Sequence, residues 1–239
     1  MEKQKFKHLI SLGATCLPRI IATRQGFKPT IEQGELAMPF DLAGHRYEGV
    51  CDILEAGFED YCNPDYFKMG KDAFDLPIVS HTKYDMWFAH EIHGSRQKFF
   101  TDNNYAMLCA LYKRRIENFY KCIDDGDILF LTHHREYPQR LNQVLKAAFP
   151  ELNYKIVALT TFAPSQFAVD DFYPVESYEA EVDYHCISFP TDEYEWLWWQ
   201  AEHYESEMGM KFEDRIGDIL SKYVDRVNPR GTAHTESQD

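Results

Sequence analysis

The sequence predicts one α/β domain, built as a three-layer sandwich around a mostly parallel sheet. Short, continuously apolar runs alternate with amphipathic segments, and the clearest series is a strand over 127–132, a helix over 138–149 and a strand over 154–160. Apolar strands separated by a helix are typical of a parallel sheet that is covered on both faces. The 239 residues, of which 44% are hydrophobic, are enough for one sizeable core.

The opening of the chain predicts a strand, a tight turn and a helix. The apolar run over 8–12 is typical of a short buried strand, and Gly13 closes it. A helix over 17–25 follows, with Pro18 in its first turn, where the missing N–H costs nothing. Three further segments complete this half of the chain: a short helix over 47–56, irregular structure over 58–80 and a strand over 85–89.

The second half begins with the clearest helical pattern, over 104–123, where aromatic and aliphatic side chains recur at helical spacing. After the strand–helix–strand series, three more elements are expected: a strand over 184–189, a helix over 191–208 capped by Thr191, and a closing helix over 212–224. Because no repeat or linker divides the chain, we expect one domain over 1–227 and a disordered polar tail over 228–239.

The charge of the chain argues against some classes of partner. There are 39 acidic and 25 basic residues, and the resulting net charge of −14 disfavours binding to nucleic acid. No apolar run approaches the roughly 20 residues that a bilayer span needs, so we expect no membrane partner and a cytoplasmic location. The sequence leaves the oligomeric state open.

The acidic residues are concentrated in one stretch. Residues 156–210 contain 12 Asp and Glu but no Lys or Arg, and they are rich in Tyr, Phe and Trp. Two interpretations are open. The stretch is either a solvated acidic face over an aromatic core, or a rim whose aromatic side chains bind cationic or carbohydrate ligands.

The sequence predicts neither a metal nor an organic cofactor. Its six cysteines are scattered without a CxxC pair, which argues against a zinc site and against a disulfide framework. His90 and His93 lie three residues apart, but the HExxH spacing and a clear third ligand are missing. The chain also lacks a GxGxxG motif, a phosphate-binding loop and a GxSxG elbow.

Cys16 has the most suggestive position among the thiols. It follows a predicted strand and a glycine turn, and it starts a predicted helix. Unpaired N–H groups at a helix start stabilise a thiolate, so we expect a lowered pKa of this thiol and an oxyanion-binding site beside the sulfur. In a parallel α/β sheet such a turn lies where ligands bind. The alternative is a small buried side chain without chemistry.

A cysteine nucleophile needs a base, and two strand exits offer histidines. His90 follows the predicted strand over 85–89, and His133 and His134 follow the strand over 127–132. Because both exits are expected at the same edge of the sheet, we expect these histidines to share a cleft with the cysteine. His90 and His133 are the two candidate bases.

Other residues near the cysteine are candidates for the same site. Asp41 follows Pro-Phe and interrupts an apolar patch with a charge, so it is either a turn-former or a carboxylate that orients the base. Four residues are candidates to contact a substrate: Gly13, Thr15, Arg19 and Phe40.

Several short blocks of the sequence resemble a known bacterial family, labelled "putative papain-like cysteine peptidases". The blocks are Ser-Leu-Gly-Ala-Thr-Cys at 11–16, Pro-Phe-Asp at 39–41, Phe-Ala-His-Glu at 88–91, a basic helix around 112–116 and a strand at 128–130. The resemblance spans residues 8–160. It implies Cys16 as nucleophile, His90 as its base and Asp41 as a further polar group. Leu42 and Glu91 stand where the family tends to have Trp and Asp.

The alternation of strands and helices bears on the fold. A papain-like fold is a split α plus β structure, whereas this chain alternates. A cysteine just after the first strand is placed like the serine of SGNH-type esterases. The expected fold is therefore Rossmann-like or SGNH-like.

Three functions follow as hypotheses. The first is a cysteine-dependent hydrolase or acyl transferase that acts on a small-molecule, peptide or carbohydrate substrate. The second is a Rossmann-like transferase that acts on nucleotide sugars, with Arg19, Arg135 or Arg140 holding phosphate. The third is a non-catalytic binding module that uses the acidic stretch after residue 156.

Overall fold

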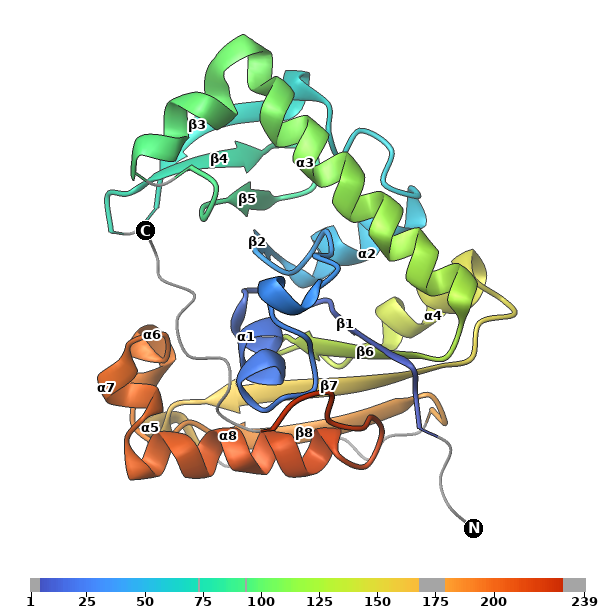
Figure 1. Ribbon diagram of the computed structural model, residues 1–239, viewed down its shortest axis with the longest axis vertical. Helices are drawn as coiled ribbons and strands as arrows, with labels where there is room; N and C mark the ends of the chain where they lie inside the picture. Colours follow the sequence, from blue (N-terminus) through green and yellow to red (C-terminus); the bar gives the residue numbers. More distant parts are fainter. Residues whose placement is uncertain (1–4, 73, 93, 168–178, 230–239) are drawn as a thin grey trace.

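A computed structural model describes residues 5–72, 74–92, 94–167 and 179–229. It contains a parallel sheet, in the lower part of Figure 1, and an antiparallel sheet in the upper part. The parallel sheet has the strand order β1-β6-β7-β8, with bounds β1 (His8–Ser11), β6 (Ile128–His133), β7 (Tyr154–Phe162) and β8 (Val182–Ser188). All three pairings in it are parallel. This confirms the prediction of a mostly parallel sheet.

Both faces of the parallel sheet are covered, because successive apolar side chains of each strand point to opposite faces. Leu9 and Leu131 point to the side of α1 (Leu17–Arg24) and α8 (Glu207–Leu220). Ile10 and Phe130 point to the other side, where three helices pack: α2 (Tyr47–Glu55), α3 (Gln97–Asp125) and α4 (Gln139–Ala148). The parallel sheet is thus the middle layer between two apolar cores.

The antiparallel sheet corrects the sequence analysis, which predicted a single sheet and irregular structure over 58–80. Its strand order is β2-β5-β4-β3, with bounds β2 (Ala43–His45), β3 (Phe67–Lys71), β4 (Pro77–His81) and β5 (Met86–Phe88). In β3 only Phe67 is buried and the next four residues are exposed, so the strand has no alternating pattern. The predicted strand over 85–89 is β5, and it belongs to this second sheet.

The helix predicted over 191–208 is also wrong. Two short helices replace it, α6 (Tyr194–Leu197) and α7 (Ala201–Tyr204), and α8 begins at Glu207. Ser206 starts a new helix because its hydroxyl accepts a hydrogen bond from the N–H of Gly209 at 3.0 Å. A Cβ at Gly209 would lie 2.1 Å from the carbonyl oxygen of His203, so only glycine allows this close approach of α7 to α8.

The helix expected over 104–123 is longer than predicted but is interrupted. Asn103, Asn104 and Tyr105 have left-handed backbone angles inside α3. The regular part that follows runs diagonally in Figure 1, from the antiparallel sheet towards α4. The short elements of the described chain are η1 (Ile31–Gln33), η2 (Pro64–Tyr66), η3 (Gly94–Arg96) and α5 (Pro164–Phe167).

Two further expectations concern the C-terminal tail and a bilayer span. The predicted disordered tail over 228–239 lies outside the described residues from position 230 onward. Across the segments that the structure covers, no helix combines the length and apolar character of a bilayer span.

Gly49 gives a test of the packing between α2 and the antiparallel sheet. Glycine normally costs a helix about 1 kcal/mol relative to alanine, so Gly49→Ala would ordinarily stabilise α2. Here a Cβ would lie 2.2 Å from the carbonyl oxygen of Tyr84. We expect Gly49→Ala to destabilise the protein by about 1–3 kcal/mol in urea unfolding. Gly70→Ala is the control, because the nearest atom to its Cβ is 3.9 Å away. An unchanged or raised midpoint for Gly49→Ala would contradict this packing.

Candidate active site

The turn after β1 is held by backbone hydrogen bonds to both sheets. The N–H of Ala14 donates to the carbonyl oxygen of His133, at the end of β6, at 3.2 Å. The carbonyl oxygen of Ala14 accepts from the N–H of His45, in β2, at 2.9 Å. Gly13 is needed for close packing, since a Cβ there would lie 2.6 Å from Cγ of Pro18. The turn therefore has little freedom to move.

Cys16 stands at the N-terminal boundary of α1. Its carbonyl oxygen accepts from the N–H of Ile20 at 3.0 Å, which begins the helix. The N–H of Leu17 donates to the hydroxyl of Thr15 at 3.3 Å, and Pro18 has no N–H. Two of the N–H groups expected at this helix end are thus unavailable to a ligand. The Cys16 side chain is only 9% exposed, whereas Thr15 is exposed.

The structure brings Cys16 and His90 together. The distance from Sγ of Cys16 to Nε2 of His90 is 3.3 Å, within hydrogen-bond range for sulfur. His90 lies in the turn that follows β5, and it is exposed to solvent. The expectation that both residues lie at the same edge of the parallel sheet is wrong, because β5 belongs to the antiparallel sheet. The two residues meet where the backbone of Ala14 is hydrogen-bonded to both sheets.

The electrostatics of the thiol differ from the expectation. The pKa of Cys16 is raised to about 11, mainly by burial and to a smaller extent by the negative charge of Glu91. The backbone N–H of Cys16 and the charges of Arg19 and Arg24 act in the opposite direction but do not outweigh burial. The prediction of a lowered thiol pKa is therefore wrong. The thiol is neutral near pH 7, and where it is the donor to Nε2 of a neutral His90, the imidazole proton lies on Nδ1.

The histidines after β6 are engaged elsewhere. Nε2 of His133 lies 2.7 Å from the hydroxyl of Thr161 in the neighbouring strand β7. Burial lowers the pKa of His133 to about 3, so this imidazole is neutral. Nε2 of His134 lies 3.1 Å from the carbonyl oxygen of Leu12. Each imidazole thus has a structural partner through Nε2, while Nδ1 of His133 is buried without a hydrogen-bond partner among the described residues.

Asp41 and Phe40 are buried in the interior. Phe40 has no exposed surface and packs against the rings of His45 and Phe58, which argues against direct contact with a substrate. Oδ2 of Asp41 accepts from Nζ of Lys28 at 2.7 Å and from the N–H of Met38 at 2.7 Å. Its Oδ1 is buried and has no hydrogen-bond partner among the described residues.

Arg19 belongs to the same buried charge network as Asp41. Its Nη2 donates to Oε2 of Glu35 at 2.6 Å, and Lys28 bridges Glu35 at 3.1 Å and Asp41 at 2.7 Å. These four side chains are 1–5% exposed. Lys28 and Glu35 were not predicted from the sequence, because nothing in a polar loop signals that its charges are buried. The network argues against Arg19 as a phosphate-binding group.

A second buried charge pair lies next to His90. Oε1 of Glu91 accepts from Nη1 of Arg115 at 2.8 Å and from the hydroxyl of Tyr112 at 3.1 Å. Both donors lie on α3, which the sequence analysis identified only as a basic helix.

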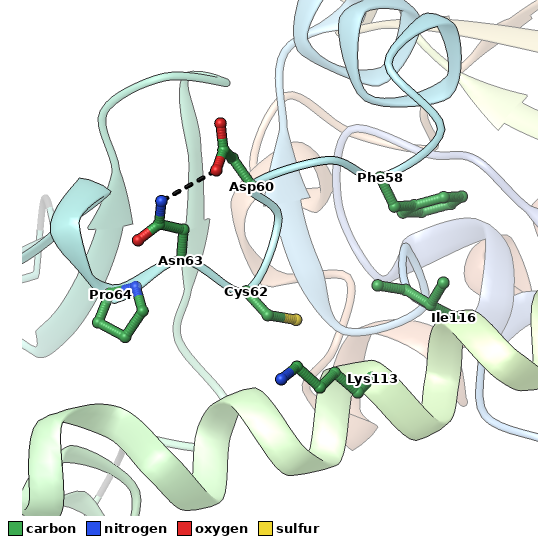
Figure 2. A pocket seen from close by; sticks show the side chains of 7 residues that line it. All are labelled: Phe58, Asp60, Cys62, Asn63, Pro64, Lys113 and Ile116. Carbon is green, nitrogen blue, oxygen red and sulfur yellow. Dashed lines mark hydrogen bonds between the residues drawn. The ribbon is translucent and has the colours of Figure 1, made fainter.

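A separate hollow of about 410 Å³ lies between α3 and the loop that follows α2. Figure 2 shows Phe58 and Cys62 of the loop facing Lys113 and Ile116 of α3, with the amide of Asn63 donating to Asp60 at 2.9 Å. None of the candidate catalytic residues lines it. Within the described parts of the chain, no three His, Cys, Asp or Glu side chains are grouped as metal ligands.

Comparison with known proteins gives one match. A family described as "Putative papain-like cysteine peptidase (DUF1796)" matches residues 7–162, the part of the chain that contains Cys16, Asp41 and His90. No curated protein and no solved structure matches the chain.

Lys28 tests the buried charge network. Lys28→Met leaves the carboxylates of Glu35 and Asp41 buried without this cation, so we expect a loss of about 3–5 kcal/mol in urea unfolding. Lys71→Met is the matched control, because its ion pair with Asp75 is exposed (62% and 81%) and is worth about 0–1 kcal/mol. Equal effects of the two substitutions would show that the network does not hold the loop.

His45 tests the cost of burying a neutral imidazole. Burial lowers its pKa to about 3, against about 6.5 in an unfolded chain. The contribution of the neutral His45 to the free energy of unfolding is complete above pH 6.5. It is lost as the pH falls towards 3, by about 1.4 kcal/mol per pH unit. Between pH 6 and 4, the slope of the unfolding free energy against pH reports how many more protons the unfolded state binds than the folded state. We expect His45→Gln to reduce this difference by about one proton. A slope identical to that of the wild type would contradict the burial of a neutral His45.

Proposed function

Since the chain belongs to the putative papain-like cysteine peptidase family, we propose that it is a cysteine-dependent hydrolase or acyl transferase with Cys16 as nucleophile and His90 as general base. The observation that carries the proposal is the 3.3 Å distance from Sγ of Cys16 to Nε2 of His90. A nucleophile and a base within hydrogen-bond range are the minimum that acyl transfer requires.

In the proposed reaction the proton leaves the sulfur as the carbon–sulfur bond forms. Sγ of Cys16 attacks a carbonyl carbon while Nε2 of His90 takes the thiol proton, and the carbonyl oxygen becomes an oxyanion. The oxyanion collapses, the bond to the leaving group breaks, and His90 gives its proton to the leaving group. A thioester on Cys16 remains. Water or another acceptor then attacks the thioester, again with His90 as base, and the thiol is restored.

The raised pKa of Cys16 favours this concerted transfer over a resting ion pair. Burial holds the pKa of the thiol at about 11, so a thiolate forms only as the imidazole removes the proton. Since Leu17 donates to Thr15 and Pro18 has no N–H, the N–H of Cys16 itself is the donor that we assign to the oxyanion. Thr15 directly precedes Cys16 and is exposed, and we assign substrate contact to its side chain.

The alternative transferase has less support. A phosphate site needs cations that are available to the ligand, but Arg19 is paired with Glu35 in the interior. Nη2 of Arg140 donates to Asp52 at 2.5 Å and to Glu55 at 3.1 Å. For a binding module on the acidic stretch, no observation compares with the contact between Cys16 and His90.

Acylation by an activated ester tests the proposed function. We expect p-nitrophenyl acetate to acetylate the Cys16 peptide of the wild type, as detected by mass spectrometry of the quenched protein. Cys16→Ser abolishes this thioester, and His90→Gln slows it by about 10²–10⁴-fold, the usual contribution of a general base. Cys186→Ser is the control, because this partly exposed thiol lies in β8 and outside the site. If acetylation of Cys16 does not depend on His90, the proposed pair is wrong.

A further inference from the structure

His90 is an exposed residue in a turn where the two residues that follow it, Glu91 and Ile92, are buried. The turn is closed by a hydrogen bond from the N–H of Ile92 to the carbonyl oxygen of Ala89 at 2.9 Å. Phe88, Glu91 and Ile92 are 0–2% exposed, while His90 is exposed. The backbone on both sides of His90 is therefore anchored in the core, and Glu91 is the charged member of the anchor.

The carboxylate of Glu91 is attached to one helix by two hydrogen bonds. Nη1 of Arg115 and the hydroxyl of Tyr112 both donate to its Oε1, at 2.8 and 3.1 Å. The donors are three residues apart on α3 and thus lie on the same face of the helix. Tyr112 is 1% exposed and Arg115 is 6% exposed, so water does not compete for these bonds.

A buried ion pair of this kind is not explained by stability. Apolar residues of similar volume often stabilise a core as well or better, because burying two charges is costly. What a buried pair supplies is a defined geometry, since each charge tolerates few other positions. Oε2 of Glu91 is buried without a hydrogen-bond partner among the described residues, so both bonds to α3 depend on Oε1.

From this geometry, and on the basis of the function proposed above, we propose that Glu91 is a positioning residue for the His90 base. Arg115 and Tyr112 of α3 hold the carboxylate of Glu91. Glu91 in turn fixes the conformation of the turn, so that Nε2 of His90 lies within hydrogen-bond distance of Sγ of Cys16. Glu91 does not contact the substrate.

The test compares variants that weaken the anchor by different amounts. Glu91→Gln removes the charge and keeps the shape, Glu91→Asp keeps the charge, and Tyr112→Phe removes a single oxygen while the ion pair stays. The control is Tyr154→Phe, since Tyr154 is also buried and its hydroxyl donates to Oδ1 of Asn142 at 2.5 Å, away from the turn.

Two readouts are used, of which the first does not depend on activity. The imidazole ¹⁵N shifts of His90, assigned with His90→Gln, report the tautomer, and we expect Nδ1–H in the wild type. In Glu91→Gln the two nitrogen shifts should move towards the average of a free imidazole. The second readout is the rate constant of Cys16 acetylation, which should fall at least tenfold in Glu91→Gln and severalfold in Tyr112→Phe, with recovery in Glu91→Asp.

The possible results separate this proposal from the proposed function. We expect Tyr154→Phe to keep the wild-type ¹⁵N shifts and an acetylation rate within twofold of the wild type. The same result in both Glu91→Gln and Tyr112→Phe would overturn the positioning role. If Glu91→Gln does not fold, Tyr112→Phe decides the question. If the wild type is not acetylated at Cys16, the proposed function fails, and the ¹⁵N shifts still decide whether Glu91 holds His90.

Discussion

The backbone of one residue, Ala14, joins the two sheets of this protein. Its N–H is bonded to the end of β6 in the parallel sheet, and its carbonyl oxygen is bonded to β2 in the antiparallel sheet. Cys16 follows two residues later, and β5, which precedes His90, pairs directly with β2. These backbone hydrogen bonds therefore bring together the two turns that carry the thiol and the imidazole. Each sheet supplies one of the two groups.

Buried charges fix the loops around this junction. Lys28, Glu35 and Asp41 hold the long segment between α1 and β2, and Glu91 with Arg115 holds the turn after β5. Neither segment has enough regular structure to define its own path. Ion pairs in the interior contribute little net stability, but each charge tolerates few alternative positions. In this protein the paired charges define the path of both loops.

The sequence predicts well where the apolar pattern is strong. The four parallel strands and the helices α1, α2 and α4 agree with their predicted ranges to within about two residues. All of them except β8 show a continuous apolar run or an amphipathic period. The β3–β4 hairpin was missed because β3 has one buried residue and four exposed ones, so its pattern is that of a loop. β3 is a strand because it pairs with β4, and its side-chain pattern does not indicate this pairing.

The site was predictable only in part, for similar reasons. The positions of Cys16 and His90 next to strands were visible in the sequence, but the sheet to which β5 belongs was not. The raised pKa of Cys16 follows from burial by residues distant in the chain, which position in a helix cannot reveal. Likewise, nothing local marks Glu35 or Lys28 as interior residues.

The packing of α1 against α8 has a consequence for how the protein is made. Nη1 of Arg24, at the end of α1, donates to Oε1 of Glu213 across 189 positions of sequence at 2.6 Å. Contacts between such distant residues form late, because closing a long loop costs entropy first. A chain leaving the ribosome therefore carries both Cys16 and His90 long before the helix that steadies α1 exists. The apolar core around α1 is therefore complete only after residues 207–220 have been synthesised, when both reacting groups are already part of the chain.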